Sequence, residues 1–216
     1  MHNTIKNLIY IEELIKSKAN HDEFVKIIAV SKTFPIENIL PLIEHGHLHY
    51  GENKVQEALE KWTDIKNENH NIQLHLIGRL QTNKVKFALK IFDYIHSLDS
   101  EKLANKISDE QQKHKKKPKI FIQVNLGNEV QKSGIDKRNL NDFYKFCKTL
   151  NLDIIGTMCI PPNDGYTKKY FSEMSDLNKK LNFKELSMGM SEDYLEAIRY
   201  NATYIRVGSK IFGSRS

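Results

Sequence analysis

Cysteine and long apolar runs are both scarce in this 216-residue chain, and each scarcity excludes a class of protein. The two cysteines, Cys147 and Cys159, are too few for a disulfide framework or a structural zinc site. No apolar stretch approaches the roughly 20 residues that a membrane-spanning helix needs. The first residues also lack the apolar block of a secretory signal. We therefore expect a globular cytoplasmic protein with no membrane partner.

An excess of basic residues gives the chain a net charge of +6, which raises the question of a nucleic-acid partner. Five of the lysines lie in one short segment, residues 113–119, and without them the net charge falls to about +1. One local cluster offers few phosphate contacts. We interpret the segment as the solvated end of a helix and expect no nucleic-acid partner.

Short β-branched runs alternate with longer amphipathic stretches along the chain. The runs that predict strands are Ile27–Ser31, His47–Tyr50, Gln73–Ile77, Tyr94–Ser97, Ile120–Asn125, Ile154–Met158, Lys184–Ser187 and Tyr204–Val207. The stretches that predict helices between them are Pro35–His45, Lys54–Thr63, Gln81–Leu89, Ser100–Lys113, Lys137–Leu150, Tyr166–Leu181 and Glu192–Tyr200. A further helix is expected at Asn3–Ser17, before the first strand.

Strands that alternate with helices pair in parallel through crossover connections, and eight such units predict a TIM-type (β/α)8 barrel. A doubly wound open sheet is the main alternative, but it normally carries a G-x-G-x-x-G turn after its first strand. Here the first strand continues into Val30-Ser31-Lys32-Thr33-Phe34-Pro35. No linker or change of composition divides the chain, so the sequence predicts a single α/β barrel domain over residues 1–216.

Function in such a barrel collects where the strands end. Lys32 follows the first strand closely, and partial burial there lowers the pKa of a lysine and leaves a neutral amine that can attack a carbonyl. On position alone, an ordinary solvent-exposed lysine remains the commoner interpretation.

Small residues and hydroxyls follow the last two strands, in Ser187-Met188-Gly189-Met190-Ser191 and Gly208-Ser209. Free backbone N–H groups at such loops bind phosphate in many barrels. Ser191 could instead cap the following helix, and both roles can coexist. A reactive lysine opposite a phosphate site suggests a phosphorylated aldehyde, with pyridoxal 5′-phosphate first and the substrate of a sugar-phosphate aldolase as the alternative.

Other titratable residues are weaker candidates. His45, His47 and His49 are spaced two apart, but no cysteine or carboxylate cluster completes a metal-ligand set. We expect no metal site, a satisfied core or rim position for His75 and a packing role for Cys147. Cys159 could be exposed at the barrel mouth, but no motif histidine marks it as a nucleophile.

The sequence resembles a known family, the YggS/PROSC-type pyridoxal phosphate homeostasis proteins. The resemblance covers nearly the whole chain and implies a fold-type III barrel that binds pyridoxal phosphate. It rests on several motifs in one order: Ala29-Val30-Ser31-Lys32-Thr33, Gly51-Glu52-Asn53-Lys54-Val55-Gln56-Glu57, His75-Leu76-Ile77-Gly78-Arg79-Leu80-Gln81-Thr82-Asn83-Lys84, Gln123-Val124-Asn125, Lys132-Ser133-Gly134, Leu186-Ser187-Met188-Gly189-Met190-Ser191, and Arg206-Val207-Gly208-Ser209 through Ile211-Phe212-Gly213.

The resemblance also implies roles for individual residues. Lys32 matches the family lysine that holds the cofactor as an internal aldimine, and Arg206 matches the residue that faces the pyridine nitrogen. Arg79 departs from the uncharged residue usual in the family, which puts the local rim charge in doubt. The positions that fall in the family's phosphate loops are Ser187, Gly189, Ser191, Gly208 and Ser209, and the one at the rim of its cofactor site is Asn53.

Two functions from different classes remain open: a carrier of pyridoxal phosphate without robust catalysis, or a small racemase-like amino-acid enzyme. Racemisation needs acid/base groups on both faces of the cofactor, and alanine racemase takes one from an additional C-terminal β-domain. We expect no such domain here, because the chain ends at Ser216, directly after the eighth unit. The sequence favours a monomeric carrier with apo-enzymes as recipients and no catalytic residues.

Overall fold

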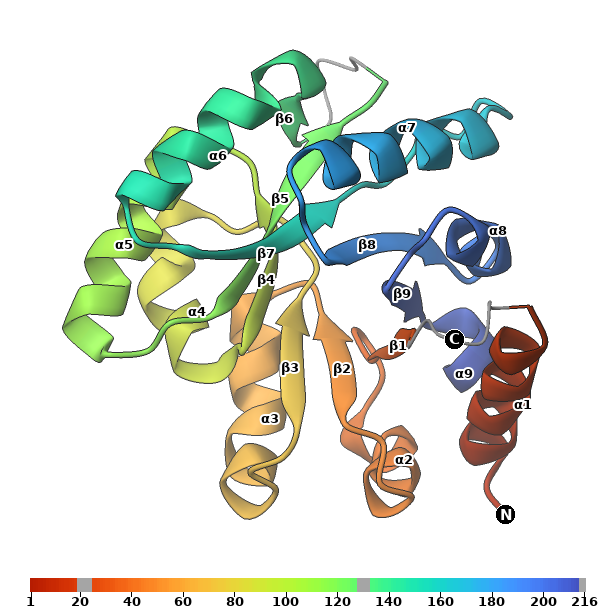
Figure 1. Cartoon of the computed structure of the whole chain (residues 1–216). Coiled ribbons are helices and arrows are strands. Elements are labelled where there is room, and N and C mark those ends of the chain that lie inside the picture. The colour runs from red at the N-terminus through yellow and green to blue at the C-terminus, as the bar shows by residue number, and fades with distance from the viewer. Residues whose placement is uncertain (19–24, 128–132, 214–216) are drawn as a thin grey trace.

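The strands of this chain pair in parallel and close into a ring. The computed structural model describes residues 1–18, 25–127 and 133–213 (Figure 1). β9 pairs with β1, and β4 pairs with β5, so the ring has no open edge. The predicted (β/α)8 barrel is therefore confirmed. In ring order its strands are β1 (Lys26–Val30), β2 (His49–Glu52), β3 (Gln73–Leu76), β4 (Tyr94–Leu98), β5 (Lys119–Asn125), β7 (Asp153–Met158), β8 (Glu185–Met190) and β9 (Tyr204–Val207).

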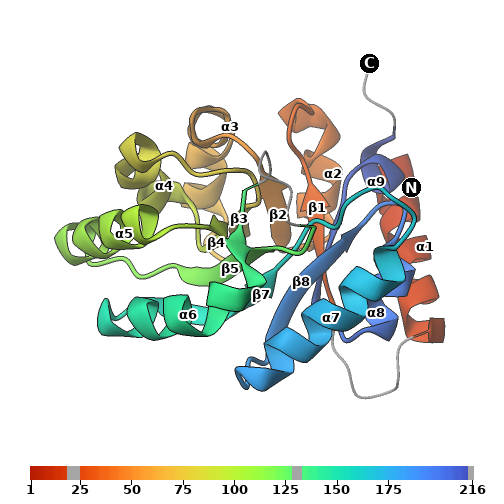
Figure 2. The ribbon, with the colours of Figure 1, turned by 90° about the horizontal axis from the view of Figure 1, so that it is seen from above.

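Helices cover the outside of the ring, as Figures 1 and 2 show from two directions. Those between the strands are α2 (Leu40–Glu44), α3 (Val55–Glu68), α4 (Val85–Ile91), α5 (Glu101–His114), α6 (Leu140–Thr149), α7 (Thr167–Lys180) and α8 (Tyr194–Arg199). α1 (Asn3–Lys18) packs against α8 and the short α9 (Ser209–Phe212), so the first and last helices lie side by side. Within the described ranges, no helix is long and apolar enough to cross a membrane.

Side chains alternate between the two faces of the barrel wall, as the strand geometry requires. One face of each strand packs against the helices in a large apolar core that includes Trp62, Leu74 and Ile205. The other face fills the inside of the barrel with a separate cluster made of Ile28, Tyr94, Phe121, Met158 and Tyr204. The barrel interior is thus packed, and the strands present their carboxyl ends at one mouth.

The helix expected at Pro35–His45 is interrupted. A 3₁₀ turn at Ile36–Asn38 comes first, and α2 begins only at Leu40. Pro41 explains the break, because proline has no N–H to continue a helical ladder and fits only the first turn of a new helix.

Two strands differ from their predicted bounds in a way that affects the site. β2 runs from His49 to Glu52 instead of from His47 to Tyr50, so Gly51 and Glu52 lie within the strand. β8 extends to Met190 instead of ending at Ser187. A two-residue strand that the sequence did not predict, β6 (Ile135–Asp136), pairs with the end of β5.

Candidate functional site

The predicted site residues come from strands that are neighbours in the ring. β1 lies between β2 and β9, so the turn with Lys32 lies between the loop that begins at Asn53 and the loop that begins at Gly208. A Cβ on Gly208 would lie 3.2 Å from the carbonyl oxygen of Val30, which shows how closely the ends of β9 and β1 approach. Sequence elements far apart in the chain therefore meet at one mouth.

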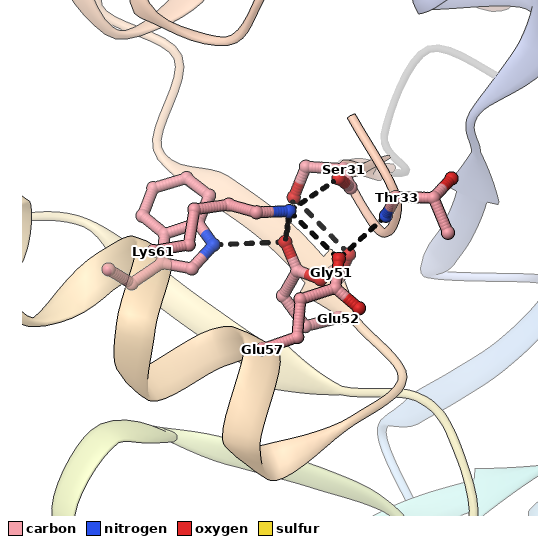
Figure 3. Close-up of polar contacts among 7 residues, drawn as sticks. Ser31, Thr33, Gly51, Glu52, Glu57 and Lys61 are labelled. Atoms are coloured by element: carbon pink, nitrogen blue, oxygen red, sulfur yellow. Dashed lines mark hydrogen bonds and ion pairs between the residues drawn. The ribbon is translucent and has the colours of Figure 1, made fainter. Parts of the chain in front are cut away.

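Lys32 is half-buried in the turn directly after β1. Its two neighbours, Ser31 and Thr33, are hydrogen-bonded to side chains of α3 (Figure 3). The backbone N–H of Thr33 donates to Glu57 Oε1 at 2.6 Å. Lys61 Nζ donates to the carbonyl oxygen of Ser31 at 3.0 Å. Thr33 has a φ of 67°, an uncommon conformation for a β-branched residue. The contacts of Ser31 and Thr33 therefore fix the backbone that carries Lys32.

Glu52 is the centre of the network that anchors this turn. Its side chain is fully buried on the helix-facing side of β2. Its Oε1 accepts hydrogen bonds from Ser31 Oγ at 2.8 Å, Lys61 Nζ at 3.0 Å and Trp62 Nε1 at 3.0 Å. Its Oε2 has no partner within the described part of the chain. Burial raises the pKa of Glu52, and the bonds from Trp62, Lys61 and Ser31 oppose that rise.

Sequence reasoning did not assign these supporting residues. Glu52 and Glu57 lie in the second motif, and their presence there was the available signal. Lys61 carried no signal, because it lies one turn further along α3 and reaches back to Ser31 across 30 positions of sequence.

Arg206 is buried inside the barrel, with only 4% of its surface exposed. Its Nη1 donates to Ser187 Oγ at 2.7 Å, and its Nη2 donates to the carbonyl oxygen of Cys159 at 2.9 Å. Burial lowers the pKa of Arg206, yet arginine keeps its charge in proteins. No carboxylate forms a direct ion pair with it in the described ranges, although the charge of Asp193 favours its protonated form. Both acceptors are neutral, so the buried charge of Arg206 still favours a ligand atom rich in electrons.

The loops after β8 and β9 are joined directly, because the backbone N–H of Gly208 donates to Ser191 Oγ at 3.3 Å. Ser191 does not cap α8, which begins only at Tyr194, so the capping interpretation is wrong. Asp193 fixes the turn instead, since its Oδ1 accepts from the N–H of Met190 at 2.6 Å. Within the described residues the Ser191 hydroxyl is given no acceptor, so its proton can be donated to a ligand.

The remaining predicted residues lie around the same mouth. Gly189 has a φ of 89°, and a Cβ there would lie 2.6 Å from the Cβ of Ala197, so only glycine fits this turn. Ser209 is exposed at the start of α9. Asn53 is half-buried after β2, and its carbonyl lies so close to Gly78 that a Cβ on Gly78 would meet it at 2.4 Å.

Cys159 is fully buried, so the expectation of an exposed thiol at the mouth is wrong. Burial raises the pKa of this thiol to about 12, which leaves it protonated and unreactive at neutral pH. Its backbone carbonyl matters instead, because it accepts from Arg206. Cys147 is also buried, as predicted. Among the described residues, no group of three or more His, Cys, Asp or Glu side chains could hold a metal ion.

Comparison with known proteins agrees with this geometry. Residues 11–216 match the model of the alanine racemase N-terminal domain family. The pyridoxal phosphate homeostasis protein of Aquifex aeolicus is 35% identical over 215 residues, which cover 95% of this chain and 93% of that protein. The corresponding protein of Pasteurella multocida is 34% identical over 216 residues, with the same coverage of 95% and 93%.

Solved structures give the same result. PipY of Synechococcus elongatus without PLP superimposes with a TM-score of 0.87 at 32% identity, over 98% of this chain and 100% of PipY. PipY with PLP bound gives a TM-score of 0.86 at 32% identity, over 97% of this chain and 100% of PipY. The chain therefore belongs to the alanine racemase N-terminal domain family and, within it, to the pyridoxal phosphate homeostasis proteins.

The Glu52 network gives a first prediction, that Lys61→Met destabilises the fold. Lys61 has 11% of its side chain exposed, and its loss leaves the Glu52 carboxylate buried with only neutral donors. Removal of one partner of a buried ion pair costs about 3–5 kcal/mol, which denaturant unfolding would measure. The control is Lys86→Met, which changes an exposed lysine on α4.

The pH dependence of this effect has a definite sign. The folded pKa of Glu52 is raised, so the folded state takes up the proton before the unfolded state does, and Glu52 destabilises the fold more as the pH rises. The deficit of Lys61→Met should therefore shrink as the pH falls toward the Glu52 pKa. An equal loss of unfolding free energy in Lys61→Met and Lys86→Met, or a loss in Lys61→Met that grows as the pH falls, would show that Lys61 does not neutralise Glu52.

Proposed function

We propose that this protein binds pyridoxal 5′-phosphate at the barrel mouth, holds it covalently on Lys32 and delivers it to apo-enzymes without robust catalysis of its own. In this proposal it acts as a monomeric single-domain barrel of the cytoplasm, spanning residues 1–216. Arg206 carries the argument, because a buried cation with only neutral hydrogen-bond partners among the described residues, on the strand next to the one that leads to Lys32, matches the ring nitrogen of a phosphorylated aromatic aldehyde. The structure of PipY with PLP bound supports the choice of ligand.

The residues present fit the parts of this cofactor. Its aldehyde supplies the electrophile with which a neutral lysine amine forms a Schiff base, and Lys32 is the half-buried amine at the mouth. Arg206 offers N–H donors to the ring nitrogen. Ser187 accepts from Arg206 and holds it in place. In this proposal the phosphate is bound by small residues of the two joined loops, and Asn53 lies at the rim of the site. The loop residues are Gly189, Ser191, Gly208 and Ser209.

The same residues favour a carrier over an enzyme. A cation facing the ring nitrogen disfavours ring protonation and weakens the cofactor as an electron sink. The Cys159 thiol stays protonated, and His75 and His96 lie inside the barrel with both ring nitrogens bonded. None of these three side chains is exposed at the mouth, where a second acid or base would have to meet a substrate. The racemase-like alternative rests on the match to the alanine racemase N-terminal domain.

Replacement of the lysine tests the covalent attachment. Lys32→Ala should abolish the borohydride-reducible link and its visible absorbance and leave thermal stability unchanged, because a turn lysine contributes little packing. Peptide mapping after reduction should place the label on Lys32 in the parent and in Lys86→Ala, the surface control. Undiminished labelling in Lys32→Ala would assign the attachment to another lysine.

The phosphate loops give a further prediction. Ser191→Ala removes one hydroxyl that can donate to a phosphate dianion, a charge-assisted bond of about 1.5–3 kcal/mol. The dissociation constant for pyridoxal phosphate should rise roughly 10- to 150-fold, as equilibrium dialysis would measure. Pyridoxal without the phosphate should bind both proteins equally, and Ser17→Ala on α1 serves as the control. Equal weakening for the two ligands would move Ser191 away from the phosphate.

Carrier and enzyme differ in what happens to an amino acid. The loaded protein should transfer its cofactor stoichiometrically to an apo-enzyme, measured by recovery of that enzyme's activity. It should incorporate little deuterium from solvent into the α position of alanine, measured by NMR, because a cofactor ring that faces a cation is a weak electron sink. Exchange at ordinary enzyme rates, on the order of 1–10³ per second, would establish the racemase-like alternative instead.

A further inference from the structure

Three imidazoles stand in series inside the barrel and lead to Arg206. His49 Nδ1 lies 2.9 Å from His75 Nε2, and His75 Nδ1 lies 2.9 Å from His96 Nε2. His96 Nδ1 lies 2.9 Å from Ser187 Oγ, which accepts from Arg206 Nη1 at 2.7 Å. The chain thus joins β2, β3, β4, β8 and β9 across the barrel interior.

The rings are held firmly in this arrangement. His75 and His96 are fully buried. His75 stacks on Tyr94 with centroids 4.1 Å apart, and His96 stacks on Phe121 at 4.3 Å. Stacking on an aromatic neighbour restricts rotation of each imidazole, so the ring nitrogens stay in line with one another.

Arg206 sets the direction of every hydrogen bond in the chain. A guanidinium only donates, so Ser187 Oγ accepts from it. The hydroxyl proton of Ser187 then has one acceptor among the described residues, His96 Nδ1. His96 must therefore carry its proton on Nε2 and donate to His75 Nδ1, and His75 must likewise donate from Nε2 to His49 Nδ1. The last donor is Nε2–H of the half-buried His49.

All three rings are neutral at neutral pH. Burial and the neighbouring cations lower the pKa of His75 and His96 well below the ordinary value, and the pKa of His49 to about 4. A charged His96 would add a second cation next to Arg206, and a carboxylate in its place would neutralise the guanidinium. A chain of neutral imidazoles adds no charge, so the positive charge of Arg206 is left unchanged.

We propose that His49, His75 and His96, all in the Nε2–H tautomer, form a positioning chain that orients the Ser187 hydroxyl and thereby fixes the Arg206 guanidinium with its charge left for a ligand. The direction of the chain depends only on the residues described above. What Arg206 faces rests on the proposed function. The three histidines are positioning residues, since they act through Ser187 and Arg206.

The first test needs no cofactor. Two-bond ¹⁵N–¹H spectra of the unloaded protein should show Nε2–H tautomers for the three histidines, assigned by comparison with His96→Asn and His75→Gln. Nδ1–H tautomers in the wild-type chain would reverse its direction and overturn the proposal.

The second test compares two substitutions of His96. His96→Phe keeps the stacking surface against Phe121 and removes both ring nitrogens, whereas His96→Asn keeps an acceptor near the Nδ1 position. The Arg206 side-chain ¹⁵N relaxation should show an ordered guanidinium in the wild type, a mobile one in His96→Phe and recovery of order in His96→Asn. A structural role alone predicts lower thermal stability in both variants with Arg206 equally ordered, and that result would overturn the proposal.

Loading with pyridoxal phosphate extends the test to the ligand. His96→Phe should raise the dissociation constant about tenfold, as expected for the loss of one bond to a charged group, and should shift the visible band of the bound cofactor. His70→Phe, at an exposed histidine, is the control. If His96→Phe does not fold, Ser187→Ala breaks the chain at its hydroxyl and should mobilise Arg206 in the same way.

Failure of the two proposals can be told apart. If the tautomers and the order of Arg206 follow these expectations but the wild type does not bind pyridoxal phosphate, the positioning chain stands and the proposed function fails. If pyridoxal phosphate binds and Arg206 keeps its order without His96, the function stands and the positioning chain fails.

Discussion

An arginine charge buried inside a barrel, with no carboxylate in direct contact among the described residues, is the constraint on which the arrangement of this site depends. The desolvation penalty for such a charge amounts to several kcal/mol. Neutral acceptors offset part of that cost here: the Ser187 hydroxyl and the Cys159 carbonyl each take one hydrogen bond from Arg206. Burial lowers the pKa of the imidazoles of His75 and His96 behind Ser187, and for His96 the charge of Arg206 lowers it further, so neither ring adds a positive charge at neutral pH. A buried cation held in this way favours an electron-rich ligand.

Strand alternation keeps this charge apart from the other buried ionic group. β2 presents His49 to the barrel interior and Glu52 to the surrounding helices, because odd and even positions of a strand face opposite sides. Lys61 can therefore neutralise Glu52 outside the barrel wall without reaching Arg206 inside it. If β2 were shifted by one residue, the carboxylate would enter the interior, so the register of one short strand decides which charge remains unpaired.

The sequence predicted those parts of the fold and site that depend on local pattern. β-branched runs located the strands, and the known behaviour of parallel barrels placed Lys32, Arg206 and Gly208 at one mouth. Contacts between distant segments could not be predicted in the same way. His49, His75, His96 and Ser187 bond one another across 26, 21 and 91 positions, and nothing in the spacing of the histidines indicates a chain. Cys159 was misplaced because its burial depends on how the end of β7 packs around Arg206.

The two supporting networks act on different parts of the mouth, which suits the carrier proposed above. Glu52, Glu57 and Lys61 hold the turn of Lys32 from the side of α3, whereas Ser187 and the histidines hold Arg206 from the interior. A covalent link at Lys32 and polar contacts at the ring and phosphate would then be made and broken separately. An incoming amine that takes over the aldehyde carbon would release the Lys32 amine and leave the ligand held by Arg206 on the neighbouring strand β9. The ligand would then leave only when its polar contacts break. The strength of its contacts with Arg206 would therefore set how long the ligand stays available to a recipient.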